Sequence, residues 1–338
     1  MINCNFGFTP LKEVWIGDSY PESFFTHLPA EVADPLCQIT QWCKEDTLRL
    51  QKFLEGRGIK VQRPKFDSID DHMKDDKLVK PPITPRDHYL VLDKTLYSLH
   101  NPLAKDRWHH VLEEYKAQGY DVQSPVNMPI NCLNPPSVVR VGRDLYIDYD
   151  THRATWGFVC ETMVQLAKKY RVNVVDTGGH CDSVFCPVAP GKIVTSHWKD
   201  NYDTSFPGWE LFHVPNETKE YQFGPYRNWQ LDNYDADQKF GQWIYDEAAD
   251  WIGAFQETVF AVNMLVIDEK NIIAVKEHEP LTKWLEQRGI TVHYFDFRTR
   301  SFFDGGWHCV TLDIHREDSC TDLFPNRGDN GVYHRENA

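Results

Sequence analysis

The chain has 338 residues, of which 41% are hydrophobic, 13% aromatic and 25% charged. This composition supplies enough apolar surface for a substantial core and excludes a disordered chain, while the length fits one large domain or two ordinary ones. A formal net charge of −14 repels phosphate backbones and anionic membrane surfaces, so we expect neither nucleic acid nor membrane as a partner.

The apolar residues are spread through the chain, and no run reaches the roughly 18 residues that a membrane span requires. The first residues lack the basic start and apolar core of a secretion signal, so we expect a cytoplasmic protein. Nine cysteines form an odd set, which argues against a disulfide framework. The sequence leaves the oligomeric state open, and a homodimer is one option.

A unit of about 60 residues recurs in shape along the chain: a hairpin, an amphipathic helix and a returning strand. The clear copies place these three parts at residues 89–99, 105–118 and 120–122, at 138–149, 154–169 and 172–175, and at 259–275, 280–288 and 290–295. Weaker copies place a strand, a helix and a strand at 14–16, 41–56 and 59–61, and strands within 185–214.

Helices between successive strands predict an α/β fold, and five like units favour closure around a central axis, as in a propeller. The alternative is a doubly wound sheet, but Gly178-Gly179 is too weak a signal for its Gly-rich phosphate loop. We predict one catalytic domain over residues 1–317 and a polar surface extension over 318–338. Residues 74–85 fit a linker or a loop between units equally well.

The segment 304–313 gathers reactive side chains around Cys309. Gly305 and Gly306 let the backbone approach a ligand closely, so we assign both to substrate binding. A cysteine beside a histidine can be held as the thiolate that attacks carbon. Most cysteines are inert core residues, however, and the local sequence alone favours that interpretation.

A second segment, 178–185, contains His180 and Asp182. In an extended chain these side chains point to the same side, where one transfers protons and the other binds a cation. A solvent-facing pair is an equally good interpretation. Metal binding by His180 with Cys181 and Cys186 lacks a second pair at the spacing expected for zinc, so we expect no metal.

Asp87, which follows Pro85-Arg86, is by itself an ordinary loop charge, and its interest comes from a family comparison. The comparison rests on residues 10–17, 85–87, 138–144, 180–182, 262–270 and 305–314, of which the last segment is the most specific. Across these segments the chain resembles the glycine amidinotransferases and, more distantly, the arginine deiminases of the same guanidino-group-modifying superfamily. The resemblance implies a pentein-like propeller of five α/β units.

The resemblance also implies a role for each matching residue. Cys309 takes the position of the nucleophile and His180 that of the general acid and base. Asp87 and Asp182 take the positions of carboxylates that clamp a guanidinium, whose planar fork accepts paired charge-assisted hydrogen bonds. The family's chemistry needs no cofactor.

Two positions depart from the family pattern. Asn134 stands where an aspartate usually orients the catalytic histidine; an amide can fix the ring but cannot stabilise imidazolium by charge. Lys199 stands where an arginine holds the substrate carboxylate, which keeps the charge but loses the bidentate fork.

The expected reaction is transfer of the amidino group of arginine to an amine, glycine or another, through an amidino-cysteine with release of ornithine. Trp307, beside the nucleophile, is a candidate shield against water. The alternatives are a hydrolase of the arginine deiminase or dihydrolase type on the same site, and a binding protein that has lost turnover through Asn134.

Overall fold

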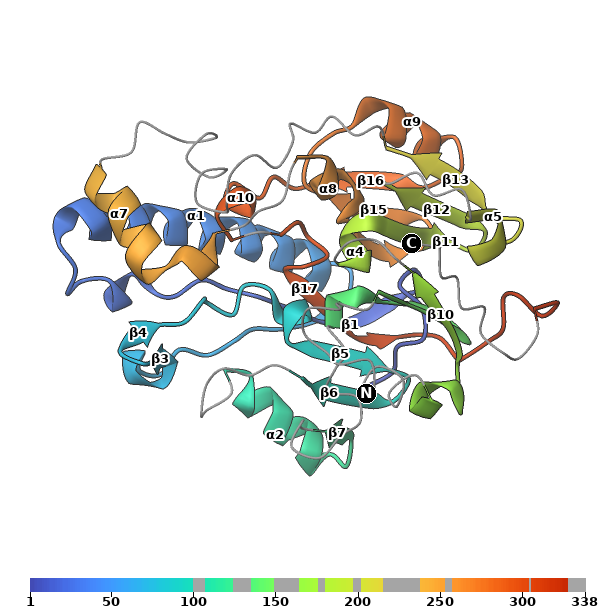
Figure 1. Ribbon diagram of the computed structural model, residues 1–338, viewed down its shortest axis with the longest axis horizontal. Helices are drawn as coiled ribbons and strands as arrows, with labels where there is room; N and C mark the ends of the chain where they lie inside the picture. Colours follow the sequence, from blue (N-terminus) through green and yellow to red (C-terminus); the bar gives the residue numbers. More distant parts are fainter. Residues whose placement is uncertain are drawn as a thin grey trace, which may run out of the picture.

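A computed structural model describes residues 1–99, 107–123, 135–148, 164–175, 180–196, 202–214, 238–252, 257–303 and 305–327. The chain is a mixed α/β protein built on small sheets (Figure 1). The predicted site residues Asn134 and Lys199 lie outside the described residues.

Five sheets of three strands share one plan in this part of the chain: a central strand pairs antiparallel with one neighbour and parallel with the other. The strands are β17 (Thr311–Arg316), β1 (Leu11–Ile16) and β2 (Lys60–Gln62); β5 (Tyr89–Leu92), β6 (Thr95–Ser98) and β7 (Asp121–Gln123); β8 (Val138–Val141), β9 (Asp144–Asp148) and β10 (Arg171–Val175); β11 (Phe185–Ala189), β12 (Lys192–Thr195) and β13 (Glu210–His213); β14 (Leu265–Asp268), β15 (Asn271–Ala274) and β16 (Thr291–Tyr294). A separate hairpin joins β3 (Met73–Lys74) to β4 (Lys77–Leu78).

The helices connect the sheets and cover them. They are α1 (Ala30–Glu55), α2 (His109–Ala117), α4 (Cys181–Val184), α5 (Tyr202–Ser205), α7 (Gln238–Glu247), α8 (Glu257–Val262), α9 (Glu279–Glu286) and α10 (Arg300–Phe303), with 3-10 turns η1 (Glu22–Phe24), η2 (Ile69–His72), η3 (Pro85–Asp87), η6 (Pro135–Ser137) and η7 (Ala249–Trp251). None of the helices in the described ranges combines the length and apolar character that a membrane crossing needs.

Helix α1 shows how the sequence dictates packing. Its buried residues include Leu36, Cys43, Leu50 and Leu54, spaced so that they share one face, which packs into the largest apolar cluster with β1. The helix ends at Gly56, and Gly58, at φ 75°, turns the chain toward β2. Helices α1 and α7 lie side by side at one end of the molecule (Figure 1).

The predicted hairpins and returning strands at 89–123, 138–175 and 265–294 are confirmed, except that residues 105–106, 149 and 154–163 lie outside the described ones. Residues 259–262 are wrongly predicted as a strand, since α8 occupies them. The first helix begins at Ala30 rather than at residue 41. Strand β1 finds its antiparallel partner in β17, at the far end of the sequence.

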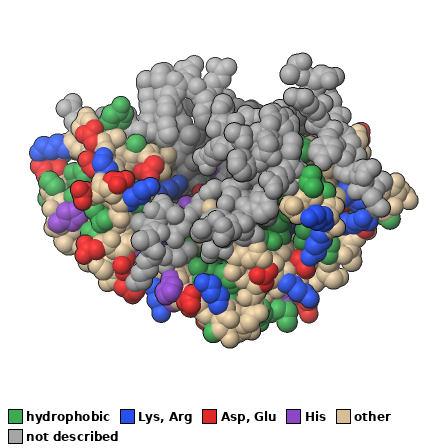
Figure 2. All heavy atoms as spheres, turned by 60° about the horizontal axis from the view of Figure 1, so that its bottom comes forward, with side chains coloured by type: hydrophobic (Ala, Val, Ile, Leu, Met, Phe, Trp, Pro, Cys, Tyr) green, Lys and Arg blue, Asp and Glu red, His purple; other side chains and the backbone are tan. Residues whose placement is uncertain are grey.

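Residues 318–327, the described part of the predicted polar extension, lie mostly at the surface but are attached to the body of the protein. Phe324 is buried in the second apolar cluster, and Asp318 accepts hydrogen bonds from Asn3, Asn5 and Thr9. Polar side chains of this segment therefore bind the body of the protein. Elsewhere on the surface, Lys and Arg side chains are interspersed with Asp and Glu on the described part of the face in Figure 2.

One buried carboxylate joins several sheets. Asp313 on β17 accepts hydrogen bonds from Arg86 Nη2 at 2.9 Å, from Arg140 Nη2 at 3.2 Å and from Arg316 Nε at 2.9 Å. Arg140 on β8 also donates to the Val91 oxygen on β5, and Arg316 to the Val266 oxygen on β14, each at 2.6 Å.

Burial would raise the pKa of Asp313, but the charges of Arg316, Arg86 and Arg140 outweigh burial and hold that pKa far below its ordinary value. The carboxylate is therefore ionised at every pH at which the protein is expected to stay folded. Removing its charge would leave three buried guanidinium groups without their common partner.

We expect Asp313→Asn to lower the free energy of unfolding by about 3 kcal/mol or more, because it breaks a buried ion cluster. Because the pKa of Asp313 is depressed, its carboxylate stabilises the fold fully at pH values above the ordinary aspartate pKa. This stabilisation is lost progressively as the pH falls below about 4. Urea unfolding at several pH values should show the deficit at neutral pH and a smaller one in acid. Glu317→Gln, which removes the surface pair with Lys12, should leave the unfolding midpoint unchanged; equal midpoints for both variants would contradict the central role of Asp313.

Candidate active site

Cys309 lies in the loop between α10 and β17 and is 4% exposed. Asn263, between α8 and β14, holds it from two sides: Cys309 N donates to Asn263 Oδ1 at 3.0 Å, and Asn263 Nδ2 donates to Cys309 Sγ at 2.9 Å. The His308 backbone N–H also donates to the Asn263 backbone oxygen at 3.4 Å. The backbone N–H and the sulfur of Cys309 are thus both bound by the side chain of Asn263.

The two glycines before the cysteine make this packing possible. A Cβ at Gly306 would lie 2.8 Å from both the backbone and the side-chain oxygen of Asn263. A Cβ at Gly305 would lie 2.8 Å from Cys309 Cβ. The structure therefore explains both glycines by contacts within the protein, and their assignment to substrate binding stays a prediction.

Asp182 on α4 lies beside the sulfur. Its Oδ2 is 2.8 Å from His308 Nδ1 and 3.9 Å from Cys309 Sγ, and the residue is 3% exposed. Burial would raise the pKa of Asp182, but the hydrogen bond from His308 and the charges of His308, His180 and Arg86 lower it below its ordinary value. The carboxylate is therefore negative at neutral pH.

The histidine of this pair is held in the neutral state. Burial lowers the pKa of His308, the positive charge of Arg86 lowers it further, and the opposing effect of Asp182 does not compensate. Since the neutral ring has one N–H, the bond to an ionised Asp182 assigns that proton to Nδ1. The sequence drew attention to His308 only as a neighbour of Cys309; its contact with Asp182 was missed.

His180 precedes α4 and is partly buried, with φ −77° and ψ 114°. The extended geometry expected for residues 180–182 is wrong, because Cys181–Val184 is a helical turn, so the argument that His180 and Asp182 alternate onto one side does not hold. The charge of His180 nevertheless contributes to lowering the pKa of Asp182, two residues along the chain.

The third predicted segment also lies at this loop. Arg86 Nε donates to the His308 and Thr311 oxygens at 3.0 Å, so the turn η3 is joined to the loop that carries Cys309. Asp87 is the next residue of η3 and is half-buried. Its predicted contact with a guanidinium remains a prediction.

Trp307 is not placed as we expected for a shield against water. Its side chain is fully buried in the largest apolar cluster, and Nε1 donates to the Phe295 oxygen at 2.6 Å. The indole therefore stabilises the loop from the core side.

A small cavity of about 30 Å³ adjoins the cluster and has room for about one water molecule. Arg86, Arg140, Asp182 and His308 line its polar side, and Cys186 is among its other lining residues. Burial raises the pKa of Cys186 to about 12, so this second thiol stays protonated and inert.

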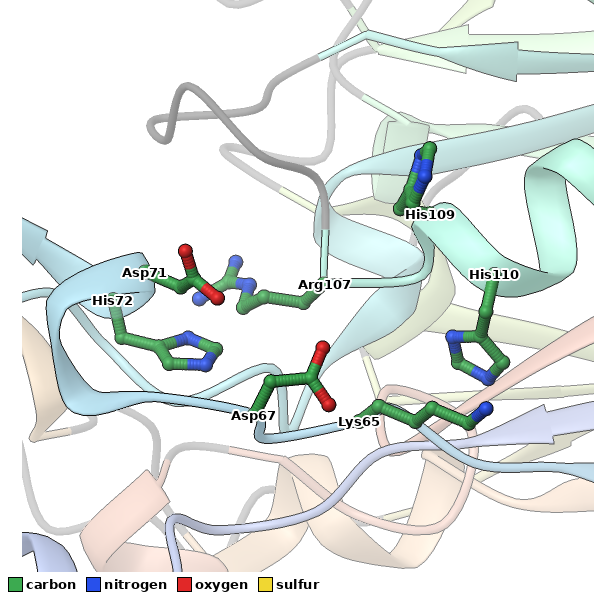
Figure 3. A pocket seen from close by; sticks show the side chains of 7 residues that line it. All are labelled: Lys65, Asp67, Asp71, His72, Arg107, His109 and His110. Carbon is green, nitrogen blue, oxygen red and sulfur yellow. The ribbon is translucent and has the colours of Figure 1, made fainter.

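A separate pocket opens between the segment after β2 and the start of α2 (Figure 3). It is lined by Lys65, Asp67, Asp71, His72, Arg107, His109 and His110. Lys65 and Arg107, two carboxylates and three histidines line it together, and no group of His, Cys, Asp or Glu in the described ranges is arranged to hold a metal ion. We assign this pocket no part in the chemistry at Cys309.

We expect Asp182→Asn to lower the pKa of His308 below its value in the unaltered protein. The carboxylate's hydrogen bond and charge are what favour the imidazolium, and an amide supplies neither charge nor an equally strong acceptor. Titration of the ring signals by NMR checks this, with Asp34→Asn on the exposed face of α1 as the control. A higher or unchanged pKa in Asp182→Asn would show that the pair is not coupled as described.

Comparison with known proteins begins with the sequence. No family model matches the chain. An L-arginine:L-lysine amidinotransferase of Pseudomonas savastanoi pv. phaseolicola is 24% identical over 156 residues, 45% of this chain. The mitochondrial glycine amidinotransferase of Gallus gallus is 22% identical over 201 residues, 57% of this chain. The chain spans only 35% and 40% of the length of these two curated relatives.

Solved structures show the same fold over almost the whole chain. SxtG, an amidinotransferase from Microseira wollei in the saxitoxin biosynthetic pathway, matches with a TM-score of 0.68 at 18% identity, covering 96% of this chain and 99% of that one. The inosamine-phosphate amidinotransferase StrB1 from Streptomyces griseus matches with a TM-score of 0.69 at 17% identity, covering 95% and 98%. A dimethylarginine dimethylaminohydrolase matches with a TM-score of 0.55 at 12% identity, covering 89% and 99%. The chain is thus similar over part of its sequence to two amidinotransferases, and it shares its fold with amidinotransferases and with a dimethylarginine dimethylaminohydrolase.

Proposed function

We propose that the protein transfers the amidino group of arginine to an amine acceptor through an amidino-cysteine on Cys309 and releases ornithine. The observation that carries this proposal is the buried Cys309 sulfur 3.9 Å from the ionised Asp182. A guanidinium held by that carboxylate brings its carbon to the sulfur, which is the proximity that nucleophilic attack requires.

In the first half of the reaction the Cys309 thiolate attacks the guanidino carbon and forms an S–C bond. The C–N bond to the side chain of arginine then breaks, its electron pair passes to nitrogen, and His180 supplies the proton that completes the amine of ornithine. Asp182 and Asp87 bind the guanidinium and the amidino group that remains on sulfur.

In the second half the acceptor amine attacks the amidino carbon. The new C–N bond forms, His180 takes the amine proton, and the S–C bond breaks to return the thiolate. Asn134 is proposed to orient His180, and Lys199 to bind a substrate carboxylate. The neutral state of His308 matters here, because it lets Asp182 keep its full charge for the cationic substrate.

The five sheets support a closed propeller as the scaffold. Strands β5, β8, β14 and β17 are linked by the arginines around Asp313, and residues of β8, β11 and β14 line the small cavity beside the catalytic cluster. Each of the five sheets thus contributes one strand to a shared interior. We infer that these strands surround a central axis and that Cys309 lies at one end of it, within one domain.

Hydrolysis is the alternative outcome of the same chemistry, since the fold is shared with a dimethylarginine dimethylaminohydrolase. Water in place of the amine would convert the intermediate and give a different product. The decisive experiment is therefore to supply arginine with and without candidate amines, glycine and lysine among them, and to identify the products.

We expect ornithine to exceed about one equivalent of the protein only when an amine is present, and an amidino group to appear on the Cys309 peptide in mass spectra when arginine is given alone. Cys309→Ala should abolish both while the protein stays folded, because Cys181 is buried and Cys186 is both buried and protonated. Citrulline formed from arginine at the same rate with or without an amine would replace the transferase proposal by the hydrolase. An adduct on Cys181 or Cys186 would overturn the choice of nucleophile.

We expect Asp182→Asn and Asp87→Asn each to lower kcat/KM for arginine about a hundredfold or more, because a desolvated guanidinium loses one of its two charged partners. Steady-state kinetics should show a higher KM together with a lower kcat. Asp34→Asn, an exposed substitution on α1, is the matched control and should behave as the unaltered protein. Normal kinetics in both site variants would show that the guanidinium binds elsewhere.

A further inference from the structure

Asn263 contacts the proposed nucleophile through both atoms of its amide. It is 1% exposed, in the connection from α8 to β14. Its oxygen accepts from Cys309 N and its nitrogen donates to Cys309 Sγ. A backbone N–H can only donate, so the oxygen must face it, and the NH₂ group is thereby directed at the sulfur.

The charges around Cys309 make this donor important. Asp182 on α4, 3.9 Å from Sγ, is negative and opposes a second negative charge on sulfur. His308 in the same loop is neutral, and Arg86 of η3 is bound to Asp313 and to the His308 and Thr311 oxygens. His180 acts on Asp182 from the start of α4. The amide of Asn263 donates to this sulfur at 2.9 Å.

We propose that Asn263 is a further catalytic residue: its N–H stabilises the thiolate of Cys309 before attack and again when sulfur is the leaving group, while its oxygen fixes the nucleophile's backbone. This inference rests on the proposed role of Cys309 as the nucleophile. A hydrogen bond to an ionised acceptor is worth more than one to a neutral acceptor, so the contact favours the thiolate over the thiol.

The loop sequence is adapted to this contact. Gly306 lies against Asn263, where a Cβ would approach both of its oxygens to 2.8 Å. Only glycine leaves the amide room to reach the cysteine without displacement. The same geometry gives Asn263 a role that its residue type and its position before a strand do not indicate.

The test is alkylation of the protein by iodoacetamide without arginine, followed at each pH by mass spectrometry of the Cys309 peptide. Exposed Cys320 serves as the internal reference for reagent reactivity. We expect the pH midpoint of Cys309 alkylation to rise by about one unit in Asn263→Ala, which removes a hydrogen bond to a charged group. Asn263→Asp, of equal size, should raise it further, because an anion then faces the sulfur.

Trp307→Phe is the matched control for loosening of the loop, since it removes the bond to the Phe295 oxygen without touching the sulfur. It should leave the midpoint unchanged. Unaltered midpoints in folded Asn263→Asp and Asn263→Ala, or an equal rise in Trp307→Phe, would overturn the inference. If the unaltered protein transfers no amidino group but its alkylation still depends on Asn263, the proposed function fails and the thiolate contact stands.

Discussion

The shared carboxylate of Asp313 is the interaction on which the remaining structure depends. Three arginines meet on it, and two of them continue to backbone oxygens of β5 and β14. Burying such a cluster costs desolvation, so its presence is better explained by the geometry it imposes than by net stability. Arg86 extends that geometry to the His308 oxygen, and the loop that holds Cys309 is thereby attached to the most constrained point of the fold.

The same buried charges divide the roles of the catalytic cluster. Burial and the charge of Arg86 keep the imidazole of His308 neutral, while the hydrogen bond from His308 and the charges of His308, His180 and Arg86 lower the pKa of Asp182 against burial and keep it ionised. A neutral ring orients Asp182 through Nδ1 without cancelling its charge, so the carboxylate remains available to a cation. In the proposed reaction, that cation is the guanidinium of the substrate.

Local patterns predicted most of the hairpins, because strand alternation and turn residues act over short distances. The pairing of β1 with β17 joins the two ends of the sequence, and no local pattern could indicate it. Residues 259–262 form an apolar run that is compatible with a strand or with a buried helix. In the folded protein they belong to helix α8. Cys309 and Asp182 were identified through motifs, whereas the roles of Asn263 and His308 exist only as contacts between segments that the sequence separates.

These contacts also indicate that the Cys309 loop does not select the acceptor. Gly305 and Gly306 present no side chain, Trp307 is buried in the core, His308 is engaged with Asp182, and Cys309 is held by Asn263. Each position therefore packs or holds the loop around Cys309, and in the proposed mechanism this loop serves formation of the intermediate, a step that transfer and hydrolysis share. An amine and a water molecule would meet the same sulfur, the same carboxylate and the same amide donor. Selection of the acceptor must then come from groups outside this loop that contact the acceptor itself or control its entry.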